Sequence, residues 1–147
     1  MASEVRKVVL IEHSAQRMFA LVDGVEDYPA FLPWCGGGEV LERTDSLTTA
    51  VLHVNYHGIR THFSTRNEKV FPGSMRLNLV EGPFKHLEGE WLFKALGNAA
   101  CKIEFNLRYE FSSKLLEKAL GPVFNHIANT FVEAFVRRAN QLQQEKP

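Results

Sequence analysis

Two neighbouring segments near the C-terminus have the clearest pattern in this chain: CKIEFNLRYEF at residues 101–111 and KLLEKALGPVFNHIANTFVEAFVRRANQLQ at residues 114–143. In the first segment apolar and polar residues alternate, which is typical of an antiparallel strand with one buried face. In the second segment apolar residues recur at spacings of three and four, which predicts an amphipathic helix with an aromatic stripe. The two apolar surfaces must cover each other, and bulky side chains on both can leave a cavity between them.

Size and composition fit one domain over residues 1–147. The 17 basic and 17 acidic residues cancel, so no overall field attracts DNA or an anionic membrane. Cys35 and Cys101 have neither the spacing of a zinc site nor the density of a disulfide scaffold. The first residues lack a signal-peptide core, and no apolar run approaches the ~20 residues that span a bilayer. We therefore expect a soluble, cytoplasmic protein without a metal or cofactor.

The first 35 residues predict one strand and two short helices. Residues 5–13 are apolar on both sides, which predicts a strand that is well covered. Ser14 is a suitable N-cap for a helix that continues to about Val22. Two prolines then limit residues 28–35 to one short helical turn.

Residues 39–111 predict a series of antiparallel hairpins, because turn signals rich in Gly and Pro separate short alternating runs. The expected strands are 39–43, 49–56, 61–71, 74–81, 87–95 and 101–111. With the first strand, they give a curved antiparallel sheet of about seven strands. Gly121-Pro122 predicts a short turn followed by a main helix from Pro122, since proline inside a helix costs about 3 kcal/mol. The predicted fold class is α+β, with the sheet wrapped around a long C-terminal helix.

Three features that suggest chemistry have simpler interpretations. His53, His57 and His62 could converge on a metal, but no acid or cysteine completes a ligand spacing. The glycines at 36–38 lack the Lys-Ser or Lys-Thr of a phosphate loop, so we expect a flexible loop. Cys35 is a candidate nucleophile, although a lone cysteine usually acts as a small buried apolar residue. The apolar faces of the best-defined strand and helix contain no carboxylate, which argues for binding without catalysis.

Basic side chains in the predicted sheet suggest a second kind of surface. Acidic residues are interspersed among them, so a solvated mixed-charge face is the simplest interpretation. Contact with ribosomal RNA is the sharper hypothesis. The candidate contact residues are Arg60, Arg66, Arg76 and Lys85.

Four segments carry a family resemblance: YPAFLPWC at 28–35, FSTRN at 63–67, GPF at 82–84 with LEGEWLF at 87–93, and FVEAF at 131–135 with RRA at 137–139. They resemble the START-like (SRPBCC) family of coenzyme Q-binding proteins and bacterial ribosome-association toxins. The resemblance implies a helix-grip fold. It also implies one of two functions, a carrier of ubiquinone or its precursors that supports respiration, or a factor that binds the large ribosomal subunit and blocks subunit joining. Related proteins are often labelled polyketide cyclases. The chain lacks the N-terminal extension of mitochondrial members, so it resembles a bacterial one.

Together these observations predict a helix-grip domain that binds a polyprenyl quinone between sheet and helix and performs no catalysis. Burying ~300 Å² of isoprenoid at about 25 cal/mol per Å² would supply on the order of 7 kcal/mol before ordering costs. Transient contact with a membrane is compatible with such a carrier. The ribosome-directed toxin and a cyclase-like enzyme are the alternatives. The predicted ligand-binding residues are Phe31, Trp34, Phe63, Leu79, Phe84, Trp91, Phe124, Ile127, Phe131 and Phe135.

Overall fold

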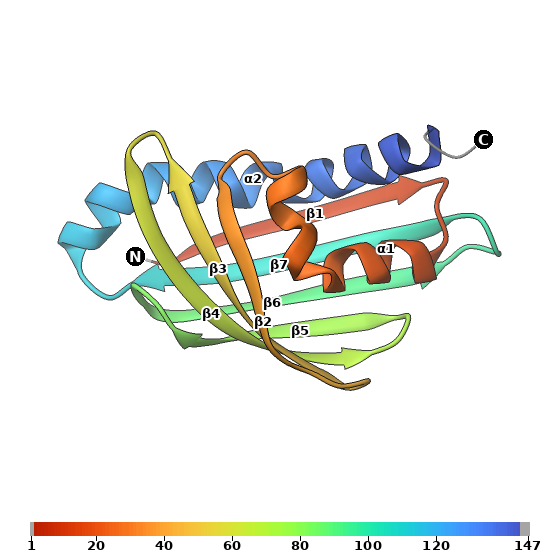
Figure 1. The fold of residues 1–147 in the computed structure, drawn as a ribbon, viewed down its shortest axis with the longest axis horizontal. Coiled ribbons are helices and arrows are strands. Elements are labelled where there is room, and N and C mark those ends of the chain that lie inside the picture. The colour runs from red at the N-terminus through yellow and green to blue at the C-terminus, as the bar shows by residue number, and fades with distance from the viewer. Residues whose placement is uncertain (1, 145–147) are drawn as a thin grey trace.

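The computed structural model describes residues 2–144 and shows a seven-stranded antiparallel sheet that curves around one long helix (Figure 1). The strand order across the sheet is β1-β7-β6-β5-β4-β3-β2, so β1 and β2 form its two edges. This architecture confirms the predicted α+β helix-grip class, including two short helices after the first strand. In chain order the elements are β1 Ser3–Ile11, α1 Ala15–Asp23, the 3₁₀ helix η1 Val25–Ala30, β2 Cys35–Arg43, β3 Leu47–Tyr56, β4 Ile59–Val70, β5 Ser74–Glu81, β6 Phe84–Ala95, β7 Cys101–Phe111 and α2 Lys114–Gln144.

The core lies between the concave face of the sheet and α2, as the two periodicities predict. On β7 the alternate residues Cys101, Ile103 and Phe105 are at most 1% exposed. On α2 the residues Phe124 and Phe135 are buried at the same interface. Period two in the strand and period 3.6 in the helix therefore bring their apolar surfaces together.

The outer face of β1 is not covered, contrary to the prediction from its apolar run. Val8 is 59% exposed and Leu10 is 71% exposed, while Val5 on the other face is buried. The helices cover only the concave face of the sheet, and β1 is an edge strand, so its outward side chains meet no second layer.

The three glycines at residues 36–38 belong to β2, and the prediction of a flexible loop is wrong. Gly37 pairs with His53 on β3. A Cβ at Gly38 would lie only 2.2 Å from the carbonyl oxygen of Val25 in η1. The strand needs glycine there because η1 packs directly on its backbone.

Helix α2 is continuous from Lys114, so the prediction of a break before Pro122 is also wrong. The ring of Pro122 is exposed, and the carbonyl of Lys118 that loses its helical partner lies on an exposed residue that water can reach. Gly121 precedes the proline and has no Cβ to clash with the proline ring. Packing of the apolar stripe on the sheet then offsets the lost hydrogen bond.

A polar network with a buried part at Lys69 and an exposed part at Arg43 joins the end of α1 and the start of η1 to the sheet. The ammonium of Lys69 on β4 lies 3.0 Å from Asp23 Oδ2, and its side chain is only 4% exposed. The hydroxyl of Thr48 donates to Asp23 Oδ1 at 2.8 Å. The guanidinium of Arg43 donates to both carboxylate oxygens of Glu26 at 2.8 and 2.9 Å. These bonds fix the position of η1 over the concave face of the sheet. They thereby also fix the segment that leads from η1 to Trp34.

Candidate functional site

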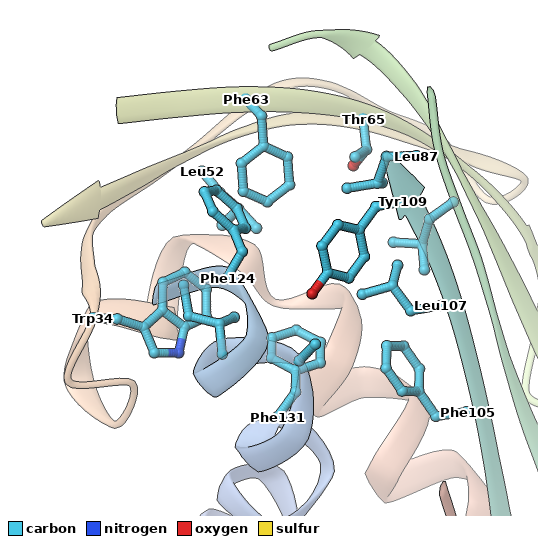
Figure 2. A pocket seen from close by; sticks show the side chains of 13 residues that line it. Trp34, Leu52, Phe63, Thr65, Leu87, Phe105, Leu107, Tyr109, Phe124 and Phe131 are labelled. Atoms are coloured by element: carbon cyan, nitrogen blue, oxygen red, sulfur yellow. The ribbon is translucent and has the colours of Figure 1, made fainter. Parts of the chain in front are cut away.

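An apolar cavity of about 70 Å³ lies between the concave face of the sheet and α2. Figure 2 shows side chains from the strands and from α2 pointing into this space from opposite sides. Its lining comprises Trp34, Leu52, Phe63, Thr65, Leu77, Leu87, Phe105, Leu107, Tyr109, Phe124, Ile127, Ala128 and Phe131.

Regular spacing in the elements places these side chains. Phe63 and Thr65 are alternate residues of β4, and Phe105, Leu107 and Tyr109 are alternate residues of β7, so each set shares the concave face. On α2, Ile127 and Ala128 each lie three or four positions from both Phe124 and Phe131, so all four share one side of the helix. The cavity is therefore built on rigid elements on both sides.

The segment after η1 closes one side of the cavity. The ring of Trp34 lies 6.1 Å from that of Phe131, and Tyr28 and Phe31 each lie 5.2 Å from Phe135. The guanidinium of Arg138 lies 5.6 Å from the ring centre of Phe31 in a cation–π contact. We call this aromatic segment, which contains Phe31 and Trp34, the lid.

The two hydroxyl groups in the lining, those of Thr65 and Tyr109, already have hydrogen-bond partners. The hydroxyl of Tyr109 donates to Asn125 Oδ1 on α2, and burial raises the pKa of Tyr109. The hydroxyl of Thr65 donates to Asn67 Oδ1 at 2.9 Å. No carboxylate, histidine or lysine belongs to the described lining. The cavity therefore offers exclusion of water and shape, and it does not present the acid–base pair that a cyclase or hydrolase needs.

Five of the ten predicted ligand-binding residues line this cavity: Trp34, Phe63, Phe124, Ile127 and Phe131. The other five lie elsewhere in or near the core: Phe31, Leu79, Phe84, Trp91 and Phe135. Sequence reasoning missed eight lining residues: Leu52, Thr65, Leu77, Leu87, Phe105, Leu107, Tyr109 and Ala128. For the β7 residues the alternating pattern itself was the available signal.

Two of those five residues, Trp91 and Phe84, border the cavity without lining it. Trp91 is fully buried and lies behind the cavity, with its ring 4.6 Å from Phe105 and 5.7 Å from Phe131. Phe84 fills the opposite end, where it contacts Phe63 and Phe124 at 5.8 and 5.0 Å. These rings set the limits of the cavity and leave only the space between them.

The cavity is small for the predicted ligand. An engineered protein cavity of about 150 Å³ holds benzene. A cavity of about 70 Å³ is therefore too small to hold a quinone ring. A polyprenyl quinone could enter only if the lid or α2 moved away from the sheet.

The other candidates for chemistry are inert or dispersed. Cys35 is buried, its thiol donates to the Gly37 carbonyl at 3.3 Å, and burial raises the pKa of that thiol, which disfavours the thiolate. His53 and His62 are cross-strand neighbours, whereas His57 lies in the β3–β4 turn. Within residues 2–144 no three side chains form a group that could hold a metal ion.

The four predicted RNA-contacting residues differ in their partners. Arg76 lies 3.5 Å from Glu90, and Lys85 lies 3.7 Å from Glu110. Arg60 and Arg66 are exposed on the outer face of β4 and have no ion pair with any described residue. Their charges are therefore free to meet an external anion.

Comparison with known proteins gives consistent matches over nearly the whole chain. The model of the family described as "Polyketide cyclase / dehydrase and lipid transport" matches residues 11–136. The chain is 43% identical over 142 residues to the "Ribosome association toxin RatA" of Pseudomonas aeruginosa, covering 97% of this chain and 99% of that protein. It is 27% identical over 140 residues to the "Coenzyme Q-binding protein COQ10 homolog B, mitochondrial" of Xenopus laevis, covering 91% and 57% of the two chains.

Solved structures share the fold. The crystal structure of the Zhui aromatase/cyclase from Streptomyces sp. R1128 matches with a TM-score of 0.81 at 16% identity, over 96% of this chain and 95% of that one. Such low identity supports the shared architecture alone. No helix within residues 2–144 is long and apolar enough to cross a membrane.

Proposed function

Because the chain belongs to the polyketide cyclase/dehydrase and lipid transport family, we propose that it associates with the large ribosomal subunit through the outer surface of its sheet. The observation that carries this proposal is the contrast between a nearly filled interior and an outer face on which Arg60 and Arg66 have no ion pair with any residue of 2–144. The chain is also similar over almost its whole length to a protein named as a ribosome association toxin, which supports the same proposal.

Physical chemistry favours a contact through charge at this surface. Ribosomal surfaces are rich in phosphate, and each phosphate that a cationic side chain neutralises releases a condensed counterion. The chain as a whole is neutral, so attraction must come from local groups such as Arg60 and Arg66. A protein of this kind binds RNA at a defined patch and is not drawn to nucleic acid in general.

Sedimentation with purified large ribosomal subunits across a salt series tests this proposal. We expect the protein to pellet with the subunits at about 50 mM salt and to dissociate progressively towards 200 mM, as phosphate contacts do. A protein that stays in the supernatant at every salt concentration would contradict the proposal.

The apolar cavity between sheet and helix favours a second candidate function, the binding of a small hydrophobic ligand. Similarity to a protein named as coenzyme Q-binding supports a quinone as the chemical class of that ligand. Native mass spectrometry of the protein purified from its own host tests this candidate. A co-purifying quinone would support the carrier, whereas a ligand-free protein that also takes up no short-chain ubiquinone would contradict it.

A cyclase-like activity has weaker support. The matched aromatase/cyclase has only 16% identity, and the described lining of the cavity holds no acid–base pair. The relatives above are named as a toxin and a coenzyme Q-binding protein.

A further inference from the structure

At the tip of the β3–β4 hairpin the partly buried Tyr56 and the exposed His57 form a group of rings with His126 of α2. The ring of Tyr56 stacks on that of His126 with centroids 5.5 Å apart and planes within 6°, and His57 meets Tyr56 edge-on at 4.2 Å. Both imidazoles are exposed. Figure 1 shows this turn beside the first half of α2. We call Tyr56, His57 and His126 the hairpin-tip rings.

The turn has the backbone of a regular two-residue hairpin, and its His57 is exposed. His57 has φ of 50° and Gly58 has φ of 81°, the pair of positive values that a two-residue type I′ turn requires. Tyr56 pairs with Ile59 directly across the turn. The rings are therefore held by a regular hairpin on one side and by helix α2 on the other.

A polar hollow of about 410 Å³ lies beside this tip on the outer side of the hairpin. Its polar lining includes His53 and Asn55 on β3 together with Arg60 and His62 on β4. The carboxylate of Glu39 lies at its edge, 3.6 Å from His53. We call this the Arg60 hollow.

The Arg60 hollow differs in charge from its neighbours on the sheet. The hollow around Arg76 and Arg108 contains Glu88 and Glu90 in its lining, and these carboxylates lie near the arginines. The described lining of the Arg60 hollow contains no carboxylate. Residues 46–67, which form most of β3 and β4, contain no aspartate or glutamate at all. An anion is therefore better accommodated at the Arg60 hollow than at the hollow around Arg76.

We propose that the Arg60 hollow binds an RNA phosphate while the hairpin-tip rings stack on an adjacent unpaired base. The guanidinium of Arg60 supplies a fixed charge and several donors for phosphate oxygens. Imidazole and phenol rings supply the stacking surface that single-stranded RNA uses. A nucleotide chain that crosses the tip meets the guanidinium on one side and the rings on the other. This assignment rests on the proposed association with the ribosome. It identifies where on the protein the RNA binds and which interactions hold it.

Three variants test the assignment in the full-length chain. Arg60→Ala removes the charge at the hollow, and His57→Asn removes a ring while keeping a residue that tolerates positive φ. Arg76→Ala is the matched control, because it removes an exposed arginine from a hollow that holds carboxylates. Binding is measured by sedimentation with large ribosomal subunits and by fluorescence anisotropy with a labelled 20-nucleotide oligouridylate. Unfolding midpoints of all variants show whether each one is folded.

We expect Arg60→Ala to weaken both interactions about tenfold at 100 mM salt and to reduce the salt slope by about 0.7 to 0.9, the loss of one phosphate contact. We expect His57→Asn to weaken oligouridylate binding about fivefold or more, in line with the loss of one stacking partner. Arg76→Ala should change either affinity less than twofold. Ultraviolet crosslinking in the subunit complex should place the RNA on a peptide that contains residues 53–62.

The outcomes separate this inference from the proposed function. If the wild-type protein binds subunits but Arg60→Ala and His57→Asn bind equally well, the hollow is not the RNA site, although ribosome association stands. If crosslinks fall only outside residues 53–62, the same conclusion follows. If the wild-type protein fails to bind subunits, the proposed function fails. In that case binding of oligouridylate that depends on Arg60 would still support the site, and no binding would overturn both.

Discussion

Gly38 of β2 lies directly against the backbone of Val25 in η1, so that a Cβ on Gly38 would approach the Val25 carbonyl oxygen to 2.2 Å. This contact fixes the distance between the edge of the sheet and the helix that leads into the lid. Backbone on both sides leaves no flexible side chain that could move aside.

The first prediction concerns this contact. Gly38→Ala should destabilise the protein by about 1 to 3 kcal/mol, because the added methyl group pushes η1 away from β2. Displacing η1 should also loosen the lid and expose Trp34, which is now 3% exposed. Urea unfolding and a red shift in tryptophan fluorescence measure the two effects. Gly73→Ala is the control, since a Cβ there meets only the Val70 oxygen at 3.9 Å, and an equal loss in both variants would contradict the prediction.

The second prediction concerns the buried ion pair between Lys69 and Asp23. Lys69→Met should cost about 1 to 3 kcal/mol of unfolding free energy, because it removes the nearer of two cations beside the largely buried Asp23 carboxylate and leaves only Arg43, whose Nε lies 3.7 Å from Oδ2. Asp23→Asn combined with Lys69→Met should recover part of that loss. The exposed pair of Arg76 and Glu90 is the comparison, and Arg76→Ala should cost at most about 1 kcal/mol. A Lys69→Met variant as stable as wild type would show that the pair does not hold α1 in place.

The third prediction concerns pH. The guanidinium of Arg43 donates two hydrogen bonds to Glu26 and lowers the pKa of that carboxyl below its usual 4.5. A lowered folded-state pKa means that the stabilisation is present above the unfolded pKa and is lost as pH falls through the folded value. The stability difference between wild type and Glu26→Gln should therefore be constant from pH 7 to about pH 5 and shrink below that. Urea midpoints at pH 3 to 7 measure it, and a difference that grew on acidification would contradict this assignment.

The fourth prediction concerns the cavity. Ala128 lines it from α2, and Ala128→Leu should fill the space at a cost of at most about 1 to 3 kcal/mol in stability while abolishing uptake of a short-chain quinone. Ala119→Leu on the exposed side of the same helix is the control and should leave uptake unchanged. Quenching of tryptophan fluorescence by ubiquinone-1 measures binding. Equal uptake by wild type and Ala128→Leu would place any quinone site outside this cavity.

Much of the fold follows from local patterns in the chain. Alternation over residues 101–111 determines which face of β7 is buried, and the spacing of Phe124, Ile127 and Phe131 determines which side of α2 meets the sheet. The turn at His57 and Gly58 follows from a glycine that accepts positive φ. These features depend on neighbours within a few residues, so the sequence is sufficient to predict them.

The candidate sites needed distances between segments far apart in the chain. Which aromatic rings border the cavity depends on how β4, β7 and α2 approach one another, so Trp91 and Phe135 could not be separated from Phe131 by their spacing. Charge gives a second example. Arg76 and Arg60 are both arginines in the region of the predicted sheet, but in the part of the chain that the structure describes Arg76 has an ion-pair partner, Glu90 on the adjacent strand, and Arg60 has none.

The sequence by itself determined the helix-grip architecture and the faces that its main strand and helix bury, because hydrophobic periodicity acts locally and has one compact solution here. Tertiary structure alone decided the volume left inside, the course of α2 through Pro122 and the position of Gly36 to Gly38 within β2. Each of these features depends on many packing contacts between segments that are far apart in the chain. A local sequence pattern does not predict such contacts.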